Sequence, residues 1–322
     1  MKVLIIKLGA LGDVINTLPL VINIKDELNA EIHWLVAPLS YPLIKAHGSV
    51  DRAILFDKHN LKKFLPLVLK GIRQTRYDIV LDLQRLLKSA LFCMFAKADR
   101  RIGFDKNRCK ELSWIFPFER IPGADPPGHM LTQYMEFADY LDVKSDKISW
   151  NIPLQTMDVN GLPSEYIVLN IGATKRANRW SPEYFAILAD MIADKIGFKS
   201  VITGGAEDLP FAETIQAKAR CKIKSLCAKT SLKELTHVLA KAQCVVSCDT
   251  GPMHLAVAVK TNLVALFGPS DPFRTGPFHG TIIKKKMACS PCNKRECSNP
   301  VCMEKIKPEH VMNKLMEKVT QK

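Results

Sequence analysis

The alternation of short apolar runs with longer helical stretches most constrains how this chain can fold. Runs rich in Val, Ile and Leu at 3–6, 32–36, 52–56 and 78–83 have the length of buried strands. Helical stretches such as LKKFLPLVLKGIRQ separate them. Strands that alternate with helices predict an α/β protein with a parallel sheet.

The same rhythm occurs twice along the chain. Residues 151–165 are rich in turn formers, and apolar runs then return at 166–172, 199–205, 244–249 and 262–268. A chain of 322 residues is also long for one core. We therefore predict two Rossmann-like domains, 1–157 and 158–322, with a terminal amphipathic helix from Pro308. Ligands are expected at the carboxyl ends of the strands, in a cleft between the domains.

The net charge of +14 is unevenly distributed. Residues 58–110 contain 14 Lys and Arg against four Asp. This excess indicates an anionic partner (nucleic acid, an anionic membrane surface or a phosphorylated substrate), although a solvated basic face explains it equally well. No apolar run approaches the roughly 18 residues of a membrane span, and the first residues lack a signal-peptide pattern. We therefore expect a cytosolic protein.

Two glycine turns follow predicted strands. The first turn, KLGALGDVINTLP from Lys7, has the negative charge of Asp13 where a bound phosphate would need positive potential. It also lacks the Gly-Lys-Ser/Thr sequence that ends a P-loop. VVSCDTGPMHLAVAV places Pro252 at the first position of a helix, after Asp249, Thr250 and Gly251 and before His254. The second turn predicts a diphosphate-binding site at a helix N-terminus. The alternative is that Asp249 or Thr250 only caps the helix.

Four of the ten cysteines are clustered near the C-terminus. They lie within 14 residues, and the first pair has the C-x2-C spacing of a thiolate metal site. The later spacings fit such a site less well, so a structural zinc, two disulfides, an iron–sulfur cluster and free thiols remain open. No Asp-x-Asp motif stands beside the glycine turns, so no metal is expected in the chemistry itself. The cluster consists of Cys289, Cys292, Cys297 and Cys302.

Segments along nearly the whole chain resemble the signatures of glycosyltransferase family 9, the heptosyltransferases of lipopolysaccharide core synthesis. They are KLGALGDVINTLP, LNIGATKRANRWSPEYFAIL, VITGGAEDLP, SCDTGPMHLAVAV and LFGPSDPFRTGP, in that order. The resemblance implies a GT-B fold, in which two Rossmann-like domains face a central cleft, with the acceptor on the first and the donor on the second. It also implies inverting transfer of heptose from ADP-L-glycero-D-manno-heptose to Kdo-containing lipid A or a heptosylated inner core, without a cofactor.

The resemblance also implies residue roles. Asp13 is the general base for the acceptor hydroxyl. The family often has a lysine before its Arg/His-Trp pair, but here that position is Asn178. Arg179 is therefore the first candidate for the cation that opposes the negative charge of the leaving ADP. Lys175 and Arg176, on the same loop, are the next candidates. The donor-binding residues implied are Thr174, Arg179, Glu207, Asp249, Thr250, Gly251, Pro252 and His254.

The basic segment of the first domain then faces the phosphates and carboxylates of the acceptor at an anionic membrane. We expect a peripheral protein on the cytoplasmic face of the inner membrane, with no nucleic-acid partner. The alternatives are a GT-B transferase for another nucleotide sugar and a basic nucleic-acid-binding protein with a zinc-ribbon-like cluster. Candidate acceptor residues are Gly12, Lys62, Lys63, Arg85, Lys88, Arg100, Arg101 and Arg108.

Overall fold

The computed structural model describes residues 1–124, 127–145, 147–155, 157–159 and 161–320. It divides into two compact units, Met1–Pro153 and Leu154–Lys322. The division lies four residues before the end of the first domain that the sequence analysis gives.

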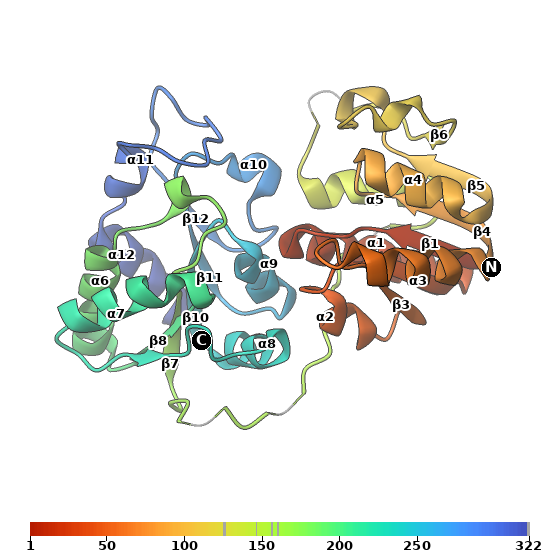
Figure 1. Cartoon of the computed structure of the whole chain (residues 1–322). Coiled ribbons are helices and arrows are strands. Elements are labelled where there is room, and N and C mark those ends of the chain that lie inside the picture. Colours follow the sequence, from red (N-terminus) through yellow and green to blue (C-terminus); the bar gives the residue numbers. More distant parts are fainter. Residues whose placement is uncertain (125–126, 146, 156, 160, 321–322) are drawn as a thin grey trace. The chain divides into compact units, whose positions relative to one another are not determined.

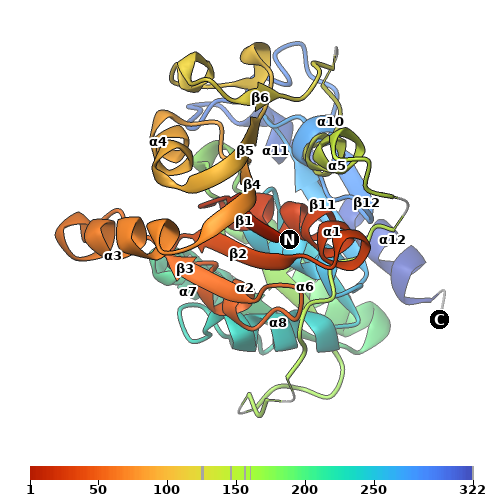
Figure 2. The ribbon, with the colours of Figure 1, turned by 90° about the vertical axis from the view of Figure 1, so that its right-hand side faces the viewer.

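The first unit is an α/β unit with a parallel sheet. Among the described residues its strand order is β3-β2-β1-β4-β5-β6 (Figures 1 and 2). The strands are β1 (Lys2–Ile6), β2 (Glu31–Val36), β3 (Arg52–Leu55), β4 (Arg76–Asp82), β5 (Lys97–Gly103) and β6 (Glu119–Arg120). The helices are α1 (Leu11–Leu28), α2 (Tyr41–Lys45), α3 (Leu61–Arg73), α4 (Leu87–Phe95) and α5 (Met130–Tyr140), with 3₁₀ turns η1 (Lys106–Arg108) and η2 (Ser113–Ile115).

Helices cover both faces of this sheet. Side chains of α3 and α4, including Val68 and Phe92, pack against Leu4, Ile6 and Val80 of the sheet. Helices α1 and α5 contact each other on the opposite face, as Figure 2 shows. Coverage on both faces explains why β1, β2 and β4 are nearly continuous apolar runs.

The second unit repeats this plan. Its strand order among the described residues is β12-β11-β10-β7-β8-β9, again parallel. The strands are β7 (Tyr166–Asn170), β8 (Lys199–Thr203), β9 (Lys224–Ser225), β10 (Cys244–Cys248), β11 (Leu263–Phe267) and β12 (Thr281–Lys284). The helices are α6 (Pro182–Ile196), α7 (Leu209–Lys218), α8 (Leu232–Lys241), α9 (Gly251–Ala258), α10 (Pro272–Thr275), α11 (Val301–Glu304) and α12 (Pro308–Val319), with η3 (Arg176–Asn178) and η4 (Ala206–Asp208).

Local sequence signals set the ends of several of these helices. Pro182 begins α6, and Gly197 ends it with a φ of 71°, a conformation that suits glycine. Ser231 caps α8 by accepting a hydrogen bond from the Glu234 N–H. Helices α6, α7 and α12 pack on one face of the second sheet, and α8 and α9 lie on the other (Figure 1).

The sequence analysis missed β5, the strand that pairs with β4. Lys97, Asp99, Arg100 and Arg101 interrupt its apolar pattern, and only its end is buried. Pairing with β4, rather than side-chain periodicity, makes this segment a strand. The short strands β6, β9 and β12 were missed for the same reason, since each has few buried residues.

Candidate active site

The glycine turn after β1 and the loop after β4 leave the first sheet side by side, because β1 and β4 are adjacent parallel strands. The strand order reverses at this point, which is where α/β sheets bind ligands. Gln84, in the loop after β4, links the two loops. Its Oε1 accepts hydrogen bonds from the N–H groups of Leu8 at 2.9 Å and Gly9 at 3.3 Å.

Asp13 lies in the first turn of α1, and its carboxylate pairs with a buried lysine. Lys7 Nζ donates to Asp13 Oδ2 at 3.2 Å and to the Leu83 carbonyl at 3.3 Å. The Lys7 side chain is 1% exposed, whereas that of Asp13 is 34% exposed. Burial lowers the pKa of Lys7, and the charge of Asp13 opposes that change. A carboxylate that is oriented by a fixed donor and still accessible can act as a general base.

Arg85 and Asp82 are two further buried charged side chains in this region. The Arg85 guanidinium lies over the Phe104 ring, 5.1 Å from its centroid, and contacts the Met130 sulfur at 3.8 Å. Within the described residues, Arg85 Nε is buried without a hydrogen-bond partner. Burial raises the pKa of Asp82 to about 6. Because a poorly paired buried cation is costly, an anionic ligand at Arg85 would be stabilising.

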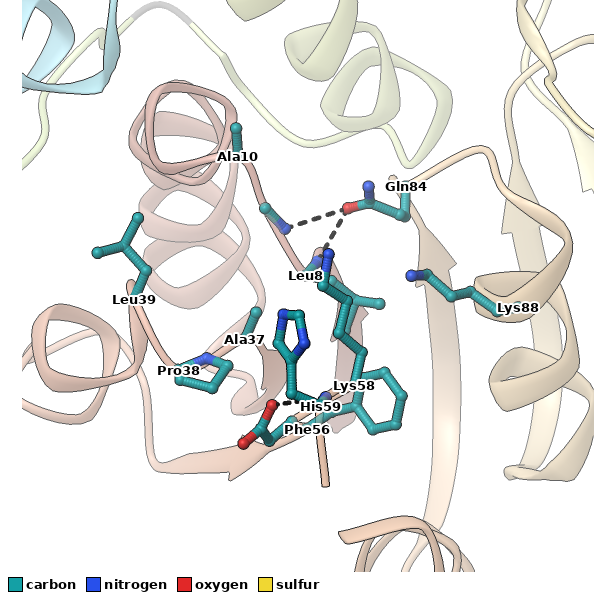
Figure 3. Close-up of a pocket in the computed structure, with 12 residues that line it drawn as sticks. Leu8, Ala10, Ala37, Pro38, Leu39, Phe56, Lys58, His59, Gln84 and Lys88 are labelled. Carbon is teal, nitrogen blue, oxygen red and sulfur yellow. Dashed lines mark hydrogen bonds between the residues drawn. The ribbon is translucent and has the colours of Figure 1, made fainter. Parts of the chain in front are cut away.

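A pocket of about 460 Å³ opens at the carboxyl ends of β1 to β4 (Figure 3). It combines apolar walls with the cationic side chains of Lys58 and Lys88, and with His59. Of the predicted acceptor residues, Lys88 lines it. The lining residues are Leu8, Gly9, Ala10, Ala37, Pro38, Leu39, Phe56, Asp57, Lys58, His59, Gln84 and Lys88.

Arg100 and Arg101, two other predicted acceptor residues, are engaged in structural contacts. Arg100 pairs with Glu119, with 2.6 Å between Nη2 and Oε2. The Arg101 guanidinium donates to main-chain carbonyls at and after the end of α4, those of Cys93, Ala96 and Ala98. These contacts join β5 to β6 and to α4.

The remaining acceptor candidates are divided between the interior and the surface. Gly12 is buried in α1, and Arg108 is buried and pairs with Glu136 at 2.5 Å. Lys62 and Lys63 are exposed on α3.

Helix α9 begins directly after β10, where the strand order of the second sheet reverses. Thr250 is the N-cap residue, but its side chain makes no capping hydrogen bond. Pro252 lies at the start of the helix, and His254 is buried in its first turn. The first N–H groups and the positive end of the helix are therefore suited to an anion.

Asp249, at the end of β10, is held by two neutral side chains. Asn178 Nδ2 donates to Asp249 Oδ2 at 3.1 Å and to Ser270 Oγ at 3.0 Å. Burial raises the pKa of Asp249, while the hydrogen bond from Ser270, the charge of Lys175 and the hydrogen bond from Asn178 lower it. Asn178 thus positions this carboxylate without neutralising it.

Arg179 has a partner that the sequence did not suggest. Its Nη2 lies 2.6 Å from Asp208 Oδ1, and its guanidinium lies over the Phe211 ring. Arg179 Nε is buried without a hydrogen-bond partner among the described residues. The role of Arg179 at the leaving group stays a prediction. Thr174 and Glu207 are both exposed on neighbouring loops.

The cysteine loop packs against the loops that hold Asn178 and Ser270. Cys292 N–H donates to the Pro269 carbonyl at 3.0 Å, and Ala177 N–H donates to the Arg295 carbonyl at 3.0 Å. All four thiols are free, so the disulfide alternative does not occur in the structure. Over the described ranges, no group of three or more His, Cys, Asp or Glu side chains is placed to hold a metal ion. A zinc at this cluster stays a prediction.

Sequence reasoning missed Lys7, Gln84, Asp208 and Ser270. Lys7 alone carried a signal, because a lysine ends an otherwise apolar strand just before a glycine turn. The partners of the other three depend on loops that are distant in the sequence. In the described part of the chain, no helix is both long and apolar enough to cross a bilayer.

Comparison with known proteins places this geometry in a family. The profile of glycosyltransferase family 9 (heptosyltransferase) matches residues 67–302. The chain is 26% identical to lipopolysaccharide core heptosyltransferase OpsX of Haemophilus influenzae, over 85% of this chain and 81% of that protein. It is also 26% identical to lipopolysaccharide heptosyltransferase 1 of Escherichia coli K12, over 90% and 93% of the two chains.

Solved structures share the fold. A family 9 glycosyl transferase from Veillonella parvula has a TM-score of 0.85 at 21% identity, over 100% of this chain and 97% of that one. E. coli heptosyltransferase WaaC with ADP has a TM-score of 0.79 at 23% identity, over 99% and 100%. The predicted GT-B fold, with its two Rossmann-like units, is confirmed. The chain belongs to glycosyltransferase family 9, the heptosyltransferases.

Proposed function

We propose that this protein transfers heptose, with inversion, from ADP-L-glycero-D-manno-heptose to the inner core of lipopolysaccharide. Family membership and the names of the relatives support the donor and the class of acceptor. The observation that carries the proposal is the pairing of Lys7 with Asp13 at the reversal point of the first sheet. It supplies an accessible, oriented carboxylate where a general base is needed.

The donor binds to the second unit in this proposal. The diphosphate lies at the N-terminus of α9, formed by Thr250, Gly251 and Pro252, where the Thr250 side chain makes no capping hydrogen bond. Asp249 and His254 contact the donor, Thr174 lies near its phosphates, and Glu207 lies near its nucleoside. Lys175 and Arg179 oppose the negative charge that develops on the leaving ADP.

The acceptor binds to the first unit, in the pocket beside the glycine turn. Arg85 lies outside the lining of this pocket, but its charge acts on Lys7, and it is buried and poorly satisfied within the protein. Kdo carboxylates and core phosphates are anions that a guanidinium recognises well. Lys58, His59 and Lys88 line the pocket itself and supply cationic or polar groups there.

The chemistry is a direct displacement at the anomeric carbon. Asp13 takes the proton of the acceptor hydroxyl as its oxygen forms the new bond to that carbon. The bond from the anomeric carbon to the ADP oxygen breaks, and its electron pair leaves with ADP. Lys7 holds the Asp13 carboxylate in place through this exchange.

We further propose that the enzyme acts on the cytoplasmic face of the inner membrane as a peripheral protein. It needs no cofactor for transfer and has no nucleic-acid partner. A structural zinc at Cys289, Cys292, Cys297 and Cys302 is a separate proposal, and elemental analysis of the purified protein tests it. A metal content well below one zinc per chain would contradict it.

Calorimetry with ADP, UDP and GDP, combined with a transfer assay, tests the division of labour. We expect wild type and Asp13→Asn to bind ADP alike and in preference to UDP and GDP, whereas Asp13→Asn loses transfer by about 100-fold or more. Asp249→Ala should weaken ADP binding. Asp26→Asn, at an exposed position on α1, is the matched control and should leave both properties unchanged. Equal loss of ADP affinity in the Asp13 and Asp249 variants would contradict the proposal.

A further inference from the structure

Helix α4 exposes an apolar stripe. Leu87, Leu91, Met94 and Phe95 follow helical spacing and are 40–47% exposed, while Ala90, Phe92 and Cys93 fill the core on the other side. The turn η2 contacts α4 and adds exposed Leu112, Trp114 and Ile115. We call these seven exposed side chains the α4 patch. Contiguous exposed apolar side chains on this scale usually mark an interaction surface.

Three lysines lie beside the α4 patch. Lys88 and Lys97 lie at the two ends of α4, and Lys106 Nζ lies 4.3 Å from the centroid of the Trp114 ring. All three are exposed, and none forms an ion pair with a carboxylate of the described residues.

The nearby carboxylates do not balance these lysines. Asp99 pairs with Arg76, and Asp105 pairs with Arg108. Glu111 is exposed and accepts a hydrogen bond from Leu87 N–H at 3.3 Å. The surface around the α4 patch is therefore apolar at its centre and cationic at its edge.

This pattern fits an anionic lipid bilayer better than a protein. Lysine is depleted from protein–protein interfaces, whereas apolar side chains ringed by lysine, with tryptophan among them, suit the headgroup region of a membrane. Two copies of this face would bring like charges together, which disfavours a symmetric dimer. A helix of nine residues is too short to cross a bilayer, so it would lie in the surface.

We propose that the α4 patch docks the first unit on an anionic bilayer, with Leu91, Phe95 and Trp114 entering the boundary between headgroups and acyl chains. Lys97 and Lys106 contact lipid phosphates. The inference rests on the proposed function in one respect: Lys88 belongs to α4 and also lines the pocket, so docking brings a lipid-anchored acceptor to it (Figure 3). Helix α3, which contacts α4, exposes Leu61 and Leu65 beside Lys62 and Lys63 and extends the same surface.

Flotation with vesicles, in the absence of donor and acceptor, tests the docking. Wild type should bind vesicles of phosphatidylglycerol and phosphatidylethanolamine, and bind phosphatidylcholine vesicles at least tenfold more weakly. Leu91→Ser/Phe95→Ser should reduce binding at least tenfold, because two large apolar side chains leave the lipid. Ile187→Ser/Ile282→Ser, two similarly exposed positions of the second unit, is the matched control and should bind like wild type.

The charge contribution is tested separately. Lys97→Gln/Lys106→Gln should weaken binding by about fivefold per lysine, and Lys222→Gln/Lys241→Gln, on the second unit, should not. Vesicles should also shift tryptophan emission to shorter wavelength, and Trp114→Phe should remove that shift, because Trp34, Trp150 and Trp180 are buried.

Equal binding to both vesicle types, or wild-type binding by Leu91→Ser/Phe95→Ser, would overturn the inference. Self-association that the same variant abolishes, without vesicle binding, would assign the α4 patch to a second copy and overturn it too. A transfer assay with a lipid-free core oligosaccharide distinguishes failure of the docking proposal from failure of the proposed function. The α4 variants should retain transfer to this acceptor. If wild type does not transfer heptose to it, the proposed function is contradicted and the result of the vesicle experiment still stands.

Discussion

Lys7 Nζ lies 3.2 Å from Asp13 Oδ2, and of the two side chains only the carboxylate reaches solvent. The lysine is fixed by a second hydrogen bond to the Leu83 carbonyl. The pair therefore joins the last residue before the glycine turn to the first turn of α1. This arrangement gives Asp13 one preferred orientation without covering it.

We expect Lys7→Met to lower kcat by roughly ten- to hundredfold, the value of a hydrogen bond to a charged group. The acidic limb of the pH–rate profile should move to higher pH by about one unit, because a donor that favours the ionised carboxylate has been lost. Lys25→Met, which breaks the exposed pair with Asp51, is the control and should leave the profile unchanged. An unshifted profile with a lower kcat would indicate a purely structural role for Lys7.

Asp82 should make the stability of the protein depend on pH. Its pKa is raised to about 6 by burial, so the folded state binds more protons than the unfolded state between about pH 4 and pH 6. The free energy of unfolding should therefore fall as pH rises through this window, by roughly 3 kcal/mol relative to Asp82→Asn. Urea titrations at pH 4, 5, 6 and 7 measure the difference. The exposed Asp26→Asn variant should run parallel to wild type, and a constant gap between wild type and Asp82→Asn would contradict the prediction.

Substitution of Arg85 should affect acceptor binding, whereas substitution of Arg101 should affect the stability of the fold. Arg85→Met removes a buried guanidinium whose Nε is unsatisfied, so it should raise the KM for the acceptor about tenfold and leave the free energy of unfolding unchanged or higher. Arg101→Met removes donors to three carbonyls and should lower the free energy of unfolding by about 1–3 kcal/mol without changing KM. Acceptor kinetics and urea unfolding of both variants decide the matter. Equal destabilisation with an unchanged KM would assign Arg85 to the core.

Asn178 should matter for the donor through Asp249. Asn178→Ala removes a donor from Asp249 and from Ser270, so the carboxylate loses part of its support. We expect ADP affinity to fall by about tenfold, the value of one hydrogen bond to a charged group. Asn299→Ala, in the nearby cysteine loop, serves as the control for titration calorimetry. Wild-type ADP affinity in Asn178→Ala would show that this contact does not position the donor site.

The local pattern of apolar residues, glycine and proline in the sequence determined where the main strands and the two glycine turns lie. The apolar runs at 3–6 and 244–249 predicted strands because parallel strands covered on both faces must be continuously apolar. The two glycine turns predicted where Asp13 and Asp249 are found, because glycine and proline mark the point at which a buried strand gives way to a turn. Strand β5 escaped this reasoning because pairing with β4 stabilises it despite its charged side chains.

Only the tertiary structure decided the partners of the charged residues. In the sequence, Arg85, Arg100 and Arg101 are equivalent cations. In the structure, Arg100 pairs with Glu119 of β6, and Arg101 donates hydrogen bonds to main-chain carbonyls at the end of α4. Arg85, in contrast, has a buried Nε without a hydrogen-bond partner among the described residues. Arg179 and Asp208 are 29 residues apart and meet because β7 and β8 are neighbours. A sequence fixes which groups exist and which face of an element is apolar. Which charge meets which depends on strand order and loop packing, because these contacts join residues that no local periodicity relates.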